Sequence, residues 1–262
     1  MHTQKTLIGV QLYGSTRLYK EDPDLWLASL AEAGFDALEP CVRVDGEELP
    51  FAWELSELPS HAERAKKARL SLLSCHLFTA DLERAVPACV RLSEEYGFQS
   101  FVTGLSGDLS RERLDSLAKK TRKAGKALRE AGLSLWLHNN APEIREKAGG
   151  ISAYEYLLRA SDGFLGAQVD TGWVACGGEE VMPFLERNRE YVRSIHHKDV
   201  SSLSSDPVNV ALGRGTVDPK GPFDFALSRG LYQVVDQDNS RADFLGDLRA
   251  SVRLLRSFSG AG

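Results

Sequence analysis

The stretch VRSIHHKDV, residues 192–200, has an apolar first half and ends in two histidines, a lysine and an aspartate. Apolar runs of about strand length recur along the chain at 7–13, 35–40, 70–78, 100–105, 133–139, 165–170 and 231–238. Amphipathic segments typical of helices lie at 22–34, 57–70, 81–97, 110–132, 178–192 and 243–258. Strands that alternate with helices predict parallel β/α units, and a length of 262 residues favours one closed (β/α)8 barrel.

Composition supports a single TIM-barrel domain over residues 1–262, in the α/β class. No Gly- or Ser-rich linker and no low-complexity run divides the chain. The G-x-G-x-x-G motif does not follow the first strand, and the G-x-x-x-x-G-K-[ST] motif does not occur. Their absence disfavours an open dinucleotide-binding sheet and a nucleotide-phosphate enzyme.

Charge and cysteine usage predict the compartment of the protein and the partners that it lacks. A formal charge of −5 gives no electrostatic reason to expect nucleic acid as a partner. The basic residues of segment 119–129 recur at helical spacing, which favours a solvated helix face over a binding patch. Four scattered cysteines, no signal-like N-terminus and no membrane-spanning apolar run together predict a cytoplasmic protein with free thiols and no membrane contact.

Polar side chains follow most of the apolar runs, where a barrel places its functional residues. They are Glu39, His76, His138, Glu143, Asp170, His196, Lys198, Asp199, Asp236 and Asp238. Asp, Glu and His side chains that converge from several parallel strands suit a hard or borderline divalent metal ion. Taken singly, each has a structural alternative, such as a hydrogen-bonded histidine, a helix cap or a turn.

Side-chain alternation sharpens the expectation for residues 192–200. His196 and Lys198 share one face of a strand, while His197 and Asp199 share the other. Only one of these pairs can point into the mouth of the barrel.

Several strand ends also resemble those of the xylose isomerase-like TIM barrels, the sugar phosphate isomerase/epimerase superfamily. The resemblance covers nearly the whole chain. It is carried by IGVQLYG (8–14), GFDALEP (34–40), HNNAPE (138–143), VDTGWVACGG (169–178), HHKD (196–199), GRGTVD (213–218) and VVDQD (234–238). The combination of D-x-G-W, H-x-K-D and G-x-G-x-x-D is its most specific part.

The resemblance implies one divalent metal ion, whether Mn, Co, Mg or Zn, held by Glu143, Asp170, His196 and Asp236. The family commonly has Glu at position 236, so direct ligation by the shorter Asp and a water-bridged contact are both open. In the family's H-N-H-x-x-E motif, this chain has Asn in place of the second His. With His196 as the ligand, His197 is expected to point away, into the layer between barrel and helices.

The implied activity is isomerisation or epimerisation of a small-molecule ketose or keto-sugar. The metal ion would polarise the carbonyl and stabilise an enediolate, while Glu143 and Asp236 move the α-proton. Lys198 and His76 would hold hydroxyls or stabilise the developing oxyanion. Further sugar contacts are assigned to Glu39, His138, Arg214 and Trp173, the last either as a stacking wall or as a loop packing residue.

Three alternatives stay open. The same site suits a metal-dependent lyase or dehydratase of a keto-cyclitol or 3-keto-glycoside. The superfamily includes AP endonucleases, which six histidines and a charge of −5 disfavour. A non-catalytic binding subunit is the third alternative. The sequence is compatible with a homo-oligomer but does not specify one.

Overall fold

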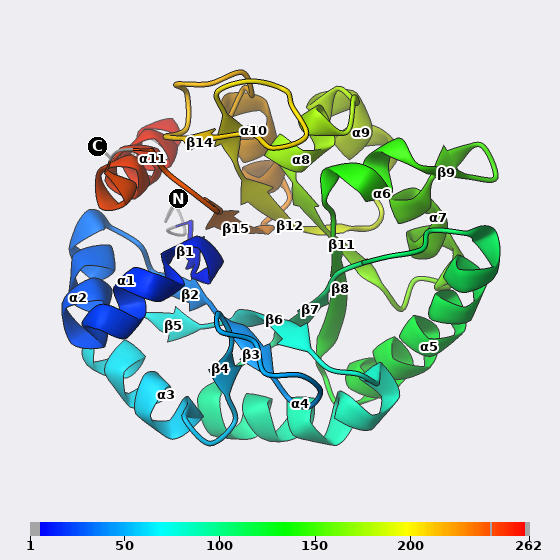
Figure 1. Ribbon diagram of the computed structural model, residues 1–262, viewed down its shortest axis with the longest axis horizontal. Helices are drawn as coiled ribbons and strands as arrows, with labels where there is room; N and C mark the ends of the chain where they lie inside the picture. The colour runs from blue at the N-terminus through cyan, green and yellow to red at the C-terminus, as the bar shows by residue number, and fades with distance from the viewer. Residues whose placement is uncertain (1–5, 242, 260–262) are drawn as a thin grey trace.

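In the computed structural model, which describes residues 6–241 and 243–259, a ring of helices surrounds a curled sheet of parallel strands (Figure 1). All the predicted strands are present. They are β1 (Ile8–Gln11), β2 (Ala37–Glu39) with β3 (Cys41–Arg43), β5 (Ser71–Leu72) with β6 (Ser74–Phe78), β7 (Ser100–Thr103), β8 (Ser134–His138), β11 (Gly166–Asp170), β12 (Val192–His197) and β15 (Tyr232–Val235).

The strand pairings close the sheet into the predicted TIM barrel. Each barrel strand pairs in parallel with the next, and β15 pairs with β1. Two barrel strands are interrupted, one at Pro40 between β2 and β3 and one at Leu73 between β5 and β6. Pro40 has no N–H for the ladder, although its carbonyl still accepts from the His76 backbone N–H at 2.9 Å.

The predicted helical segments all form helices, with shorter bounds. These helices are α2 (Pro23–Ala33), α3 (Leu58–Lys67), α4 (Leu82–Tyr96), α5 (Arg111–Glu130), α9 (Val181–Arg187) and α11 (Phe244–Phe258). The Asp22 side chain caps α2 by accepting from the Leu25 N–H, and Gly34 ends it at φ 108°. Helix α4 continues through Pro87, and α5 buries an apolar stripe that includes Leu114 and Leu128.

Several short elements were not predicted. The helices are η1 (Tyr13–Ser15), α1 (Thr16–Glu21), α6 (Ala141–Arg145), α7 (Ala153–Ala160), α8 (Thr171–Cys176) and α10 (Lys220–Ser228). The strands are β4 (Trp53–Glu54), β9 (Lys147–Ala148), β10 (Ile151–Ser152) and β14 (Asn209–Val210). The end of the predicted run 192–200 is a separate strand, β13 (Asp199–Val200), which pairs antiparallel with β14. Helix α7 completes the β/α unit after β8, and a capping box between Ser152 and Glu155 begins it.

The apolar core lies between the barrel and the helices, whereas polar side chains such as Ser74 and Gln168 point into the barrel. Phe98, Phe101 and Phe184 are fully buried in the core. Inside the barrel, the Tyr232 hydroxyl lies where a Cβ on Gly9 would be only 2.2 Å away, so glycine is required at that position. All four cysteines are buried free thiols, as predicted. Among the described helices, none has the length and apolar character to cross a bilayer.

Candidate metal and sugar site

The end of β12 directs alternate side chains to opposite sides of the barrel wall, as alternation predicts. His196 and Lys198 point inward, where they contact acidic residues of other strands. His197 points outward, where its Nε2 lies 2.8 Å from Gln233 Oε1 and its ring lies near Phe223. Burial lowers the pKa of His197 to about 4, so this side chain is a neutral structural residue.

His196 is fully buried and sits between two carboxylates. Its Nδ1 lies 2.9 Å from Asp236 Oδ2, and its Nε2 lies 2.7 Å from Glu39 Oε1. Burial disfavours the imidazolium, but the two carboxylates outweigh burial and raise the pKa of His196 to about 10. Both ring nitrogens therefore carry protons in the metal-free site.

Glu39 contacts several inward-pointing side chains of this site besides His196. Its Oε2 accepts from the Gln168 amide at 2.9 Å and from the Ser74 hydroxyl, and its Oε1 also lies 3.1 Å from His76 Nε2. Burial alone would raise its pKa, but the hydrogen bond and charge of His196 hold that pKa well below the usual range. Glu39 is therefore an ionised carboxylate with no exposed surface.

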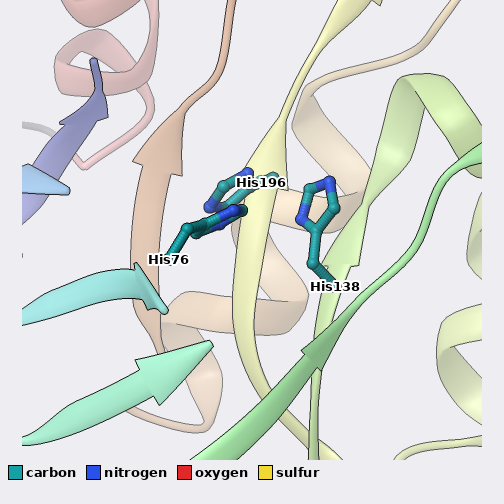
Figure 2. Close-up of side chains that lie close together, drawn as sticks. All are labelled: His76, His138 and His196. Atoms are coloured by element: carbon teal, nitrogen blue, oxygen red, sulfur yellow. The ribbon is translucent and has the colours of Figure 1, made fainter. Parts of the chain in front are cut away.

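Three histidines from separate strands converge at the mouth (Figure 2). The ring centroid of His138 lies 4.9 Å from those of both His76 and His196. Burial, reinforced by the positive His196, holds the pKa of His138 well below its ordinary value. His138 is thus neutral, which is the form of imidazole that binds metals.

Lys198 forms the centre of an acidic cluster opposite the histidines. Its fully buried Nζ lies 3.2 Å from Asp170 Oδ2 and 3.3 Å from Asp236 Oδ2, and it also contacts Asp238. These carboxylates raise the pKa of Lys198 well above its ordinary value despite burial. Gly172 makes room for the lysine, since a Cβ there would lie 2.7 Å from Lys198 Cγ.

The site has more carboxyl groups than cations. Among the residues that the structure describes, Glu39, Asp170, Asp236 and Asp238 face two cations, His196 and Lys198. The buried Asp236 Oδ1 has no hydrogen-bond partner, and Asp170 Oδ2 makes no hydrogen bond but pairs with Lys198 Nζ at 3.2 Å. Burial raises the pKa of Asp170 to about 7, because the Lys198 charge offsets only part of the cost of burial. An excess of buried carboxyl groups, with one carboxylate oxygen left without a partner, fits an added divalent cation.

Two groups of side chains could supply the ligands of such a cation. In the first, one atom from each of His138, Asp170, His196 and Asp236 lies within 4.8 Å of all the others, and all four residues are buried. The second joins His138 and His196 to His76. Two imidazoles with two carboxylates suit Mn, Co or Zn. Three of the four sequence-predicted ligands are thus brought together, and His138 joins them.

Glu143, the fourth sequence-predicted ligand, joins neither group among the described residues. It lies in the first turn of α6, where its carboxylate accepts from the Asn140 backbone N–H at 3.1 Å and from the Asn140 amide at 3.3 Å. Burial raises the pKa of Glu143. Its role as ligand or base therefore stays a prediction.

The remaining predicted sugar contacts, Trp173 and Arg214, differ in their exposure to solvent. Trp173 lies at the mouth, with its ring centroid 5.0 Å from Lys198 Nζ. Arg214 is exposed on the loop after β14. Asp199 holds that loop by accepting from the N–H groups of Gly213 and Gly215 at 2.9 and 2.8 Å, which is a structural role.

The sequence placed Asp238 among the polar side chains at the strand ends but gave it no role, and it assigned neither Ser74 nor Gln168 to this network. All three point inward and hydrogen-bond assigned residues. Alternation along the strands was the signal that would have found Gln168, which lies two residues before Asp170 in β11.

Solved structures with this fold confirm the resemblance. A sugar phosphate isomerase/epimerase from Parabacteroides distasonis superposes with a TM-score of 0.81 at 18% identity, over 98% of this chain and 95% of that chain. A xylose isomerase-like TIM barrel protein from Mycobacterium smegmatis, in complex with magnesium, gives 0.69 at 17% identity over 99% and 98%. The probable 3-DHS dehydratase AsbF from Bacillus anthracis gives 0.68 at 13% over 95% and 98%.

No model of a known protein family matches the sequence, and no curated protein matches it. At identities of 18% or less, the structural similarity establishes that this chain has the xylose isomerase-like TIM-barrel fold.

Proposed function

We propose that this chain is a divalent-metal-dependent isomerase or epimerase that moves an α-proton of a ketose or keto-sugar. The observation that carries the proposal is the convergence of His138, Asp170, His196 and Asp236 at the barrel mouth, where Asp236 Oδ1 has no hydrogen-bond partner. The similarity to a sugar phosphate isomerase/epimerase and to a magnesium-bound relative supports the same conclusion.

The four residues of this group would hold the metal ion. When bound, the ion supplies a Lewis acid that polarises a substrate carbonyl. Mixed carboxylate and imidazole ligands are compatible with Mn, Co or Zn, and the magnesium of the Mycobacterium smegmatis relative makes Mg a further candidate.

Asp236 and Lys198 are suited to the proton transfer itself. Asp236 Oδ2 is engaged by His196 and Lys198, whereas Oδ1 has no hydrogen-bond partner, so Oδ1 is the oxygen left to accept an α-proton. The Lys198 ammonium stands beside the same carboxylate and can donate to a substrate oxygen as negative charge develops there. Glu143 remains the sequence-based candidate for a second proton-transfer group.

The substrate would lie over this centre, between the strand ends and Trp173. The half-buried Trp173 offers an apolar ring face to the C–H groups of a sugar. His76, the least buried of the three histidines, is placed to contact a hydroxyl. We propose Arg214, on its exposed loop, as a contact for the outer end of the sugar.

Hydrogen exchange tests this proposal directly. The EDTA-treated protein is incubated with a panel of ketoses and keto-sugars in deuterated water, with and without Mn²⁺, and deuterium at the α-carbon is followed by NMR. We expect exchange for at least one sugar, only with metal, and none from Asp236→Asn. Metal binding without exchange on any sugar would instead favour a non-catalytic binding subunit.

A dehydratase is the second candidate, supported by the similarity to the probable dehydratase AsbF. The same general base that removes an α-proton can lead to loss of a β-hydroxyl. The exchange assay separates the two activities, because net loss of water from the sugar indicates the lyase and exchange without it indicates the isomerase or epimerase.

A further inference from the structure

We propose that Glu39 is a positioning residue that holds the His196 ring by its Nε2, so that Nδ1 is the nitrogen that binds the metal. This inference rests on the proposed function, since it needs a metal ion at the group formed by His138, Asp170, His196 and Asp236. It replaces the sugar contact that the sequence assigned to Glu39.

The two nitrogens of His196 face different surroundings. Nδ1 lies 2.9 Å from Asp236 Oδ2, and Lys198 pairs with that oxygen and with Asp170 Oδ2, so this nitrogen faces the two carboxylates of the ligand group. Nε2 faces Glu39 at 2.7 Å. A carboxylate that accepts a hydrogen bond from the distal nitrogen of a ligand histidine sets its tautomer and makes it a stronger ligand.

Glu39 is itself held in place and has no free oxygen. Oε2 accepts from Ser74 and from Gln168, while Oε1 lies within hydrogen-bonding distance of both His196 and His76. With both oxygens engaged and no exposed surface, the carboxylate cannot rotate toward a substrate. The geometry gives Glu39 one role, which is to orient its histidine neighbours.

Replacement of Glu39 by Gln should change which nitrogen of His196 carries the proton. Gln keeps the size of Glu but carries an N–H2 group in place of one oxygen. Ser74 and Gln168 already donate at the Oε2 position, so the amide nitrogen is best accommodated at the Oε1 position, facing His196. Nε2 must then accept a hydrogen bond, which moves the proton to Nδ1 and blocks the metal-facing nitrogen.

The test compares Glu39→Gln with Gln233→Met by calorimetric titration of Mn²⁺ into EDTA-treated, buffer-exchanged protein. Gln233 is the matched control because it makes the same kind of buried contact, at 2.8 Å, to the outward-facing His197. We expect Glu39→Gln to weaken Mn²⁺ binding by about 10- to 100-fold, as loss of such a partner typically does. Gln233→Met should bind Mn²⁺ as the wild type does.

A spectroscopic measurement distinguishes positioning from a general loss of structure. In the Zn²⁺-loaded wild type, ¹⁵N NMR of the histidines should show His196 with a protonated Nε2 and a ligated Nδ1. In Glu39→Gln that signature should be lost, while the signals of His197 stay unchanged. Ser74→Ala, which removes one donor to Glu39 but keeps its charge, should show a smaller loss of affinity in the same direction.

The outcomes separate the two proposals. Equal Mn²⁺ affinity in wild type and Glu39→Gln, or a wild-type spectrum with Nε2 as the ligand, would overturn the role of Glu39 and leave the metal site standing. A wild type that binds neither Mn²⁺ nor Zn²⁺ would overturn the proposed function, and the role of Glu39 with it.

Discussion

Replacement of Lys198 by Met tests the charge balance of the site. Met keeps much of the length of Lys while removing the ammonium that faces Asp170, Asp236 and Asp238. Removal of one partner from a buried ion pair costs about 3–5 kcal/mol, because the other partner is left buried and unpaired. Whole domains are stable by only about 5–15 kcal/mol. We therefore expect metal-free K198M to lose about 3–5 kcal/mol of unfolding free energy at pH 7.5.

The loss should depend on pH in a defined direction. The Lys198 charge lowers the pKa values of Asp170, Asp236 and Asp238, so its removal raises all three, and those of Asp170 and Asp238 already lie above their ordinary values in the wild type. A carboxyl group with a raised folded pKa stabilises the fold only while it is protonated, and that contribution is lost as pH rises through the folded pKa. The deficit of K198M relative to wild type should therefore shrink between pH 7.5 and pH 5.

Urea unfolding followed by circular dichroism measures these differences, at both pH values and with EDTA or Mn²⁺. Lys147→Met is the control, because Lys147 pairs with Glu179 at 3.1 Å but is half exposed, so its loss should cost less than about 1 kcal/mol. Mn²⁺ should restore part of the stability of K198M by supplying positive charge. If K198M in EDTA is as stable as the control at pH 7.5, or its deficit grows at pH 5, the reasoning is refuted.

Two further variants test the assignment of individual residues. His138→Gln should weaken Mn²⁺ binding in a calorimetric titration more than Glu143→Gln does, because His138 belongs to the ligand group and Glu143 is engaged with Asn140; the reverse order would restore the sequence-based ligand set. Glu155→Gln should lower the unfolding free energy by about 2 kcal/mol at pH 7. Burial alone would raise the pKa of Glu155, but hydrogen bonds from Arg187, Ser152 and Asn188 outweigh burial and lower that pKa to about 2. Its contribution is thus present above the unfolded pKa of about 4.3 and is lost as pH falls toward 2, so chemical unfolding should show the two proteins converging below pH 4.

The barrel was predictable because its signals are local. Each barrel strand is a short apolar run, and helices such as α2 carry their caps in the adjacent sequence. Shorter elements escaped prediction because they carry too few residues for a clear pattern. Helix α7 spans only Ala153–Ala160, and its Ser152–Glu155 capping box is a weak signal without the preceding strand as context.

The site was predictable only in part, because its decisive contacts cross the barrel. Alternation correctly placed His196 and His197 on opposite sides of the barrel wall, and the family resemblance correctly chose His196 as the inward one. The spacing in HNNAPE could not show whether Glu143 turns toward the mouth or back to Asn140, since both conformations suit the same sequence. The contact between Glu39 and His196 joins residues 157 positions apart, and no local pattern encodes it.

The central claim is that residues at the barrel mouth hold one divalent metal ion. Electron paramagnetic resonance of free Mn²⁺ during a titration of EDTA-treated, buffer-exchanged protein measures this most directly, because bound ions lose the sharp aqueous signal. We expect one equivalent to be bound by the wild type, and we expect binding to be lost in Asp170→Asn, since that carboxylate belongs to the four-residue ligand group. Wild-type protein that leaves all the Mn²⁺ free, or Asp170→Asn that binds it equally well, would contradict the account.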